Sequence, residues 1–217
     1  MSLVLHGAAL SPFVRKTRVF LDEKGLEYKS VHVDPNNQPE GFEKISPLRR
    51  IPVLEDGDQH IADSAVICAW MERKHPQPAL YPEDDYEYAR ALWFEKYADY
   101  EVALNATFAV FRNRIVMPLI GQPCDEAKVA RALEEKLPPL LDYLESQIEG
   151  RDWFAGDQFS IADIAIASQC VNLAHGGECI DAGKWPALAR HVEKVHARPS
   201  FGKLIERENS FIQGLKK

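Results

Sequence analysis

The 217-residue sequence is poor in cysteine and contains no long apolar run. Its four cysteines have neither the spacing of a disulfide framework nor the Cys-x-x-Cys pattern of a dithiol enzyme, so we expect reduced thiols in a cytoplasmic protein. They are Cys68, Cys124, Cys170 and Cys179. The first residues, MSLVLHG, lack the basic front and the apolar length of a secretory signal. No uninterrupted apolar segment approaches the ~20 residues that span a bilayer, which predicts no association with a membrane.

A basic excess is also missing, since 33 acidic side chains outnumber 26 basic ones and the formal net charge is −7. Nucleic-acid-binding proteins usually carry the opposite balance, so the net charge argues against this class. Histidine spacing gives no metal-ligand set either. His191 and His196 are not four apart, and His175 and Cys179, which are, have no further ligand near them in the sequence. We therefore predict neither a nucleic-acid partner nor a metal.

The first eighty residues alternate between strand and helix periodicity. Strands are predicted at Ser2–His6, Tyr28–Val33, Val53–Glu55 and Gln59–Ala62, helices at Ser11–Lys24 and from Asp63 to just before Pro76, and a short helical piece around Phe42–Ile45. A tight turn at Asp56–Gly57 joins the last two strands. Two consecutive strands joined by a hairpin require a mixed sheet. The order β-α-β and then β-β-α is that of an α/β thioredoxin-like domain.

Everything after the proline-rich stretch PQPALYPEDD is helical in pattern. We assign residues 1–78 to the α/β domain, 79–85 to a linker and 86–217 to an all-α helical-bundle domain. The predicted helices are Tyr86 to about Val116, Asp125 to about Ile148, Ser160–Leu173, Pro186–Ala197 and a last short one after Pro199, with breaks at Pro118 and Gly121 and a bend or split at Pro138 and Pro139.

Ser11 and Pro12 open the first helix directly after the first strand, where a thioredoxin-like fold places its working residue. Serine is a favoured N-cap and proline fits the first helical position, so an ordinary helix start explains both residues. A hydroxyl at this point also lies where the helix dipole stabilises an anion such as a thiolate. The residues alone leave both interpretations open.

The motif RIPVL raises a similar choice. Pro52 is either an ordinary edge-strand proline or a cis proline, which would expose the backbone of Val53 to an extended, peptide-like ligand. Arg49 and Arg50 just before it are either a solvated basic pair or a site for a carboxylate.

In ADSAV, Asp63 and Ser64 either cap the next helix or hold the amino and carboxylate groups of a ligand. Taken together with Ser11, these motifs describe a slot for a short peptide whose two ends differ in charge and whose thiol lies beneath Ser11.

The stretch SPFVRKTRVFLDEKGLEY, the motifs above and GDQFSIADIAIAS resemble the cytosolic glutathione S-transferases over nearly the whole chain. The serine-using classes, the tau class in particular, are most similar. In the last stretch Ser160 and Asp163 match the capping box of this family and Phe159 its hydrophobic staple, which we interpret as folding residues.

The resemblance implies glutathione as co-substrate and no metal cofactor. It implies Ser11 as the residue that hydrogen-bonds the glutathione sulfur, and a thiolate that attacks an electrophile or a hydroperoxide, an activity typical of detoxification. The implied glutathione contacts are Arg50 (with Arg49 beside it), Ile51, Val53, Asp63 and Ser64. Val53 would pair with the cysteinyl backbone, and Asp63 stands where the family usually has glutamate.

The second substrate is expected against one face of the first long helix of the all-α domain. Phe108, Phe111, Arg112 and Ile115 follow one another at i, i+3, i+4 and i+7, and Phe13 and Phe211 would complete an apolar wall. Ordinary packing explains the same spacing equally well. The family also implies a homodimer formed through the Asp63–His75 helix and the first helices of the all-α domain.

Two other functions compete with a transferase. A non-catalytic protein-binding role, as in the stringent starvation proteins, would not need Ser11, Pro52 and the Asp63–Ser64 pair together. A glutathione-dependent isomerase of the zeta type would show an SSxxS start, which is missing, and a thioltransferase would have cysteine in place of Ser11.

Overall fold

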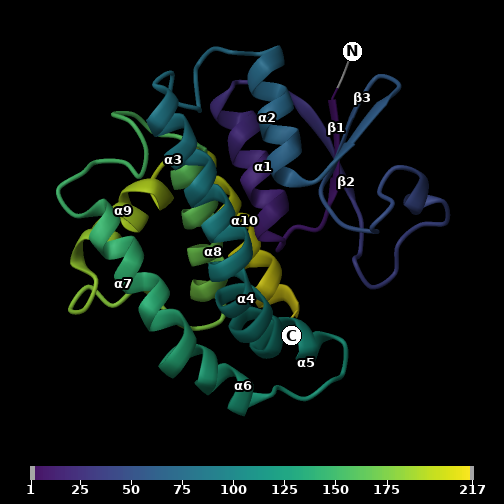
Figure 1. Cartoon of the computed structure of the whole chain (residues 1–217). Coiled ribbons are helices and arrows are strands. Elements are labelled where there is room, and N and C mark those ends of the chain that lie inside the picture. The colour runs from purple at the N-terminus through teal and green to yellow at the C-terminus, as the bar shows by residue number, and fades with distance from the viewer. Residues whose placement is uncertain (1–2, 216–217) are drawn as a thin grey trace. The chain divides into compact units, whose positions relative to one another are not determined.

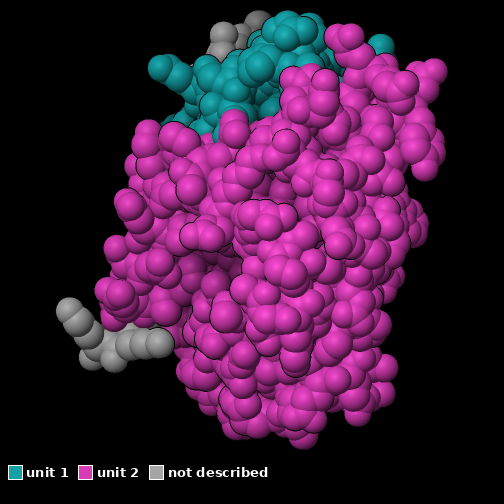
Figure 2. Space-filling view, turned by 90° about the vertical axis from the view of Figure 1, so that its left-hand side faces the viewer, with its two compact units in different colours: residues 1–81 teal, residues 82–217 magenta. Residues whose placement is uncertain are grey.

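The computed structural model describes residues 3–215, and the chain divides into two compact units, residues 1–81 and 82–217 (Figure 2). The division falls within the range 79–85 that the sequence predicts as a linker. None of the described helices is long and apolar enough to cross a membrane.

Unit 1 contains a four-stranded mixed sheet in the order β2-β1-β3-β4 (Figure 1). Its strands are β1 (Leu3–Gly7), β2 (Tyr28–His32), β3 (Val53–Asp56) and β4 (Gln59–Ala62). β2 runs parallel to β1, whereas β3 is antiparallel to both β1 and β4. This confirms the thioredoxin-like order. Ser2, at the start of the first predicted strand, lies outside the described residues.

Two helices, α1 (Pro12–Glu23) and α2 (Ser64–Lys74), lie side by side along one face of this sheet (Figure 1). Leu5 and Leu54 are cross-strand partners and are fully buried. A smaller cluster contains Val53 together with Phe42, which begins the short 3₁₀ turn Phe42–Lys44. The sheet is therefore packed on both faces around the start of β3.

The hairpin turn lies one residue later than the sequence predicts. Asp56 pairs with Gln59 and ends β3, so the two turn residues are Gly57 and Asp58. Gly57 has φ +63°, a left-handed conformation that glycine adopts without strain. Asp56 also forms an ion pair with Lys74 of α2, which favours keeping it in the strand.

Unit 2 is helical, as predicted. Its helices are α3 (Asp85–Lys96), α4 (Ala103–Asn105), α5 (Met117–Leu119), α6 (Glu126–Arg131), α7 (Leu137–Ile148), α8 (Ile161–His175), α9 (Pro186–His196) and α10 (Pro199–Leu215). Wider π-helical segments, Tyr97–Val102, Ala106–Val116 and Ala132–Lys136, join α3 to α4, α4 to α5 and α6 to α7. α8 is the central helix, with its residues from Ile161 to Leu173 buried.

Two expectations for unit 2 are wrong. The first long helix does not break at Pro118 but continues to Leu119 and ends before Gly121, which has φ +72°. Pro118 lies in the last turn of this continuous run, so it removes a helical N–H only near the helix end. The last helix, α10, is not short. It has 17 residues, and Phe201, Leu204 and Ile212 are buried along it, so packing stabilises its full length.

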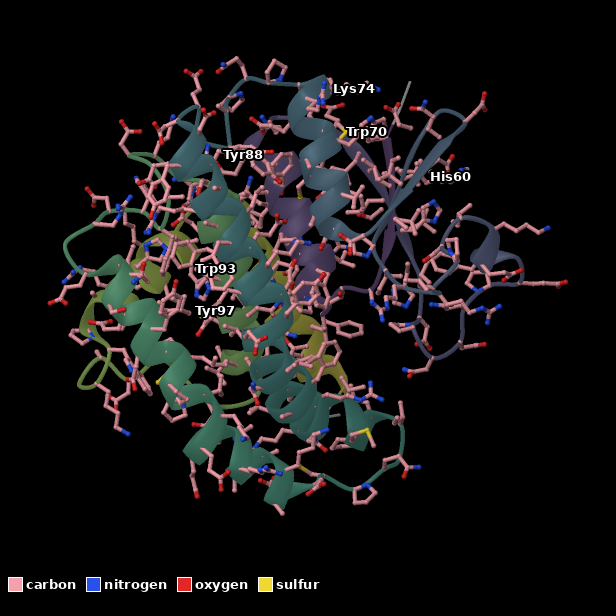
Figure 3. The ribbon with its side chains drawn as sticks, in the orientation of Figure 1. His60, Trp70, Lys74, Tyr88, Trp93 and Tyr97 are labelled. Carbon is pink, nitrogen blue, oxygen red and sulfur yellow. The ribbon has the colours of Figure 1, made fainter. Side chains whose placement is uncertain are left out.

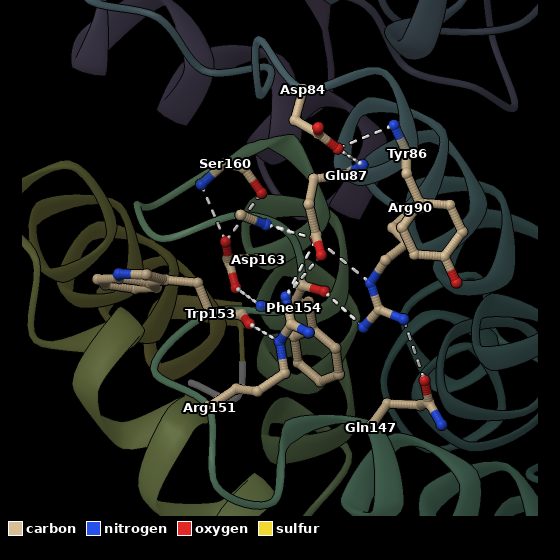
Figure 4. Close-up of polar contacts among 11 residues, drawn as sticks. Asp84, Tyr86, Glu87, Arg90, Gln147, Arg151, Trp153, Phe154, Ser160 and Asp163 are labelled. Atoms are coloured by element: carbon tan, nitrogen blue, oxygen red, sulfur yellow. Dashed lines mark hydrogen bonds and ion pairs between the residues drawn. The ribbon is translucent and has the colours of Figure 1, made fainter.

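The start of α8 shows the predicted capping box (Figure 4). The Ser160 N–H donates to Asp163 Oδ2 at 2.9 Å, and the second carboxylate oxygen accepts the Phe154 N–H at 3.0 Å. Asp163 is fully buried, so its carboxylate serves two backbone donors and connects the preceding loop to the central helix.

Candidate functional site

Three segments of unit 1 meet at one edge of the sheet. β3 is antiparallel to its two neighbours, and Val53 at its beginning lies opposite His6 of β1 and Ala62 of β4. The chain leaving β1 towards Ser11, the chain entering β3 and the chain leaving β4 towards Asp63 are therefore at the same edge. Neighbouring strands are ~4.8 Å apart, so the three segments span about 10 Å.

Both helices of unit 1 also begin at this edge. α1 starts at Pro12, shortly after β1, and α2 starts at Ser64, immediately after β4. A helix N-terminus presents unpaired backbone N–H groups and the positive end of the helix dipole. The edge therefore offers two adjacent positions that favour a negatively charged group.

Ser11 is the N-cap of α1, and its Oγ accepts the Val14 N–H at 3.4 Å. The capping interpretation is thus confirmed, although this hydrogen bond is long and therefore weak. The side chain is partly exposed, and no acceptor for its hydroxyl hydrogen is found among the described residues. Capping uses only the oxygen lone pair, so the hydrogen remains available to a ligand.

The Ile51–Pro52 bond is cis. The alternative of an edge-strand proline is wrong, because β3 lies between β1 and β4. Val53 is fully buried and has a strand neighbour on either side, His6 and Ala62. Ile51 precedes the strand and is only partly buried. A peptide-like ligand therefore has better access to the backbone of Ile51 than to that of Val53.

The two adjacent arginines, Arg49 and Arg50, differ in whether their charge is already paired. Arg49 has φ +52° and its guanidinium forms an ion pair with Glu43, with Nη2 and Oε2 2.8 Å apart. Arg50 is exposed, and the described residues give it no ion-pair partner. Arg50 is therefore the cation that is available to a carboxylate.

Ser46 was not among the residues predicted from the sequence. It is only 1% exposed and lies four residues before Arg50. Its hydroxyl donates to the Arg50 carbonyl oxygen at 2.7 Å and accepts the Arg50 N–H at 2.9 Å. The Gln38 amide contacts the same turn and donates to the Arg49 carbonyl oxygen at 2.7 Å. The Ser-Pro dipeptide at 46–47 indicates a turn but does not indicate these partners.

Asp63 caps α2, with Oδ1 accepting the Ala65 N–H at 2.9 Å and the Val66 N–H at 3.3 Å. Its φ of +79° is unusual for a residue with a side chain and costs about 1–3 kcal/mol. Both capping bonds use Oδ1, and the exposed side chain leaves Oδ2 free to accept from a ligand. Ser64, the first residue of α2, is buried.

The residues expected at the second substrate differ in their exposure. Phe111 and Ile115 are buried, whereas Phe108 and Arg112 are exposed, so burial divides the four into two pairs. They lie in the π-helical segment Ala106–Val116, whose i→i+5 turns do not follow the α-helical spacing. Phe13 is partly buried, and Phe211, on α10, is 47% exposed. The second-substrate site stays a prediction.

None of the cysteine thiols with an altered pKa is favoured as a thiolate. Burial raises the pKa of Cys170 to about 12. The pKa of Cys124 is also raised, by burial and by its hydrogen bond to the Glu126 carboxylate. Within residues 3–215, no group of three or more His, Cys, Asp or Glu side chains could hold a metal ion.

Comparison with known proteins identifies the family. Residues 5–79 match the family "Glutathione S-transferase, N-terminal domain", and residues 111–208 match "Glutathione S-transferase, C-terminal domain". A glutathione S-transferase from Hyoscyamus muticus is 29% identical over 95% of this chain and 99% of its own. The uncharacterized GST-like protein YibF of Escherichia coli is 32% identical over 92% and 96%.

A solved structure of a glutathione S-transferase from Methylobacterium radiotolerans, in complex with glutathione sulfonate, covers 94% of this chain and 95% of its own. It has 28% identity and a TM-score of 0.78. These matches do not confirm the tau class. They cover both units, and the chain therefore belongs to the glutathione S-transferase family.

Proposed function

We propose that the protein is a glutathione transferase that binds glutathione at the sheet edge of unit 1 and stabilises its sulfur as a thiolate with Ser11. The observation that carries this proposal is the convergence of Ser11, the cis Ile51–Pro52 segment and Asp63 at one edge. An extended tripeptide is about 10 Å long, which matches the span of the three strands.

Each part of glutathione has a matching group in unit 1. The γ-glutamyl end carries an amino group for the free Asp63 Oδ2 and a carboxylate for Ser64, at the N-terminus of α2. The glycine carboxylate suits Arg50, which has no other ion pair among the described residues. We assign the pairing with the cysteinyl backbone to Ile51, because Val53 already has strand neighbours on both sides.

The thiolate is stabilised in two ways. A free thiol has a pKa of ~8.5, and lowering it by ~2 units, about 2.7 kcal/mol, makes the sulfur mostly ionised at neutral pH. The Ser11 hydroxyl, which accepts only a weak capping bond, donates its hydrogen to the sulfur. The N-terminus of α1 adds a favourable electrostatic field. Serine does not act as the base, because the very high pKa of an alcohol keeps its hydroxyl protonated at neutral pH, and a neutral hydroxyl is too weak a base to take the proton of a thiol.

The reaction is then a nucleophilic displacement or addition. With an aryl chloride, the sulfur forms a bond to the ring carbon, the chloride leaves with the bonding electrons, and the thiol proton has already passed to solvent. With a hydroperoxide, the thiolate attacks the terminal oxygen, the O–O bond breaks, and the alkoxide leaves and is protonated to the alcohol. The sulfenic acid formed on the sulfur then reacts with the thiol of a second glutathione to give the disulfide and water.

Steady-state kinetics with 1-chloro-2,4-dinitrobenzene test the proposal. We expect Ser11→Ala to lose most of kcat while it still binds glutathione, and Ser11→Thr, which keeps a hydroxyl, to retain more activity. Removing the cap costs ~0.5–1 kcal/mol of stability, so the melting temperature of each variant serves as a control for folding. Turnover by Ser11→Ala equal to that of the wild type would refute the role of Ser11.

A further inference from the structure

The turn that carries Arg50 is held together by one buried hydroxyl group. The Ser46 Oγ both donates to and accepts from the backbone of Arg50, at 2.7 Å and 2.9 Å. The Ser46 carbonyl oxygen also accepts the Arg49 N–H at 2.8 Å. A hydroxyl can make both of the first two bonds because it is a donor and an acceptor at a single atom.

This arrangement fixes the direction of the chain just before the cis bond. Arg49, inside the turn, has the unfavourable φ of +52°. Its side chain is paired with Glu43 on one side of the turn. The next residue, Arg50, has both its backbone N–H and its backbone carbonyl bonded to the Ser46 hydroxyl, and its side chain is exposed. In this turn the charge of Arg49 is therefore neutralised by Glu43, whereas the charge of Arg50 is available to a ligand.

We propose that Ser46 is a positioning residue for the substrate, and that it acts through Arg50 on the carboxylate at the glycine end of glutathione. This inference rests on the proposed function. Without the Ser46 hydroxyl, the Arg50 backbone loses both of its bonds and the 46–50 turn gains freedom. Arg50 must then be ordered when the ligand binds, and this ordering weakens the binding.

Glutathione and γ-glutamylcysteine, which lacks the glycine residue, distinguish this role from a structural one. For Ser46→Ala we expect the Kd of glutathione to rise about tenfold, the effect of losing one net hydrogen-bond interaction, and kcat at saturating glutathione to stay unchanged. For γ-glutamylcysteine we expect Ser46→Ala and Arg50→Ala to lose much less affinity than they lose for glutathione, because this ligand has no glycine carboxylate for Arg50. Ser30→Ala, which changes an exposed serine of β2, is the matched control.

The double variant Ser46→Ala/Arg50→Ala tests whether Ser46 acts through Arg50. We expect it to bind glutathione no more weakly than Arg50→Ala alone, since the two residues form one unit. If Ser46→Ala does not fold, Gln38→Ala loosens the same turn from its exposed side, and we expect the same selective loss for glutathione.

Additive losses in the double variant would overturn the inference, as would an equal loss of affinity for γ-glutamylcysteine. If Ser46→Ala binds glutathione as tightly as the wild type does, the role of Ser46 is refuted and the proposed function is not affected. A wild-type protein that binds no glutathione would instead refute the proposed function.

Discussion

Asp63 caps α2, and we propose that it also holds the amino group of glutathione, so that it would combine two roles that the sequence presents as alternatives. Its Oδ1 caps α2, and its backbone has a left-handed φ of +79° at the edge of the sheet where the proposed site lies. A strained residue persists where the surrounding structure or the function requires it. Both capping bonds use Oδ1, which leaves Oδ2 for the proposed contact with the amino group of glutathione.

Asp63→Asn separates the two tasks. Asparagine caps a helix about as well as aspartate, so we expect the melting temperature to change little. The hydrogen bond to a charged amino group loses about 1.5–2 kcal/mol, which raises the Kd of glutathione ~10–30-fold. Isothermal titration calorimetry measures this change, and an unaltered Kd would show that Asp63 serves only as a cap.

For single residues, the sequence predicts the residue types at the candidate site but not which of their side chains are already bonded within the protein. The motif RRIP identifies two arginines, yet only the structure shows that Arg49 is paired with Glu43 and that Arg50 is not. Ser46 was missed for the same reason. Its partners are set by the path of the turn, which no local spacing encodes.

At the scale of elements, α3 and the loop before α8 are connected by Glu87 (Figure 4). Its carboxylate accepts the Gly156 N–H at 2.7 Å and the Arg151 guanidinium at 3.0 Å. Burial alone would raise the pKa of Glu87, but the Gly156 N–H and the guanidinium groups of Arg151 and Arg90 together lower it below its ordinary value of 4.5.

A lowered pKa in the folded state means that Glu87 stabilises the fold fully above pH ~4.5 and loses this effect as the pH falls through the folded-state pKa. We therefore expect the free energy of unfolding to fall less steeply below pH 4.5 in Glu87→Gln than in the wild type. Urea unfolding between pH 3.5 and 7 measures it. The exposed Glu83→Gln is the control, and identical pH profiles for wild type and Glu87→Gln would contradict the account.

The order of the elements was predictable because turn residues and periodicity are local signals. The π-helical segments were not, since a turn of i→i+5 leaves no distinct pattern in a chain of mixed polarity. This explains why Phe108 and Phe111, three residues apart, differ in burial although an α-helical spacing places them on one face.

At the scale of the whole molecule, unit 2 exposes an aromatic and aliphatic helix face. Trp93, Tyr100 and Leu104 are 53%, 60% and 58% exposed, and Tyr97 lies along the same helical run as Trp93 (Figure 3). The Trp93 N–H donates to the Tyr143 hydroxyl at 2.8 Å. Exposed apolar faces of this kind mark interaction sites, and the family resemblance implies a second copy of the chain.

We expect the protein to be a homodimer that uses this face and α2, where Val66 is 54% exposed. Leu104→Glu places a charge on the face and should convert the dimer into a monomer. Leu119→Glu, at another exposed leucine of unit 2, should leave the dimer intact. Light scattering coupled to size-exclusion chromatography gives the masses, and a monomeric wild type would contradict the expectation.

Ultraviolet difference absorbance in the thiolate band, followed during titration with glutathione at neutral pH, tests whether Ser11 stabilises the thiolate of bound glutathione. We expect a thiolate signal that saturates with the wild type and disappears with Ser11→Ala, although both proteins bind glutathione. Binding by the wild type without a thiolate signal, or an equal signal from Ser11→Ala, would contradict this role of Ser11.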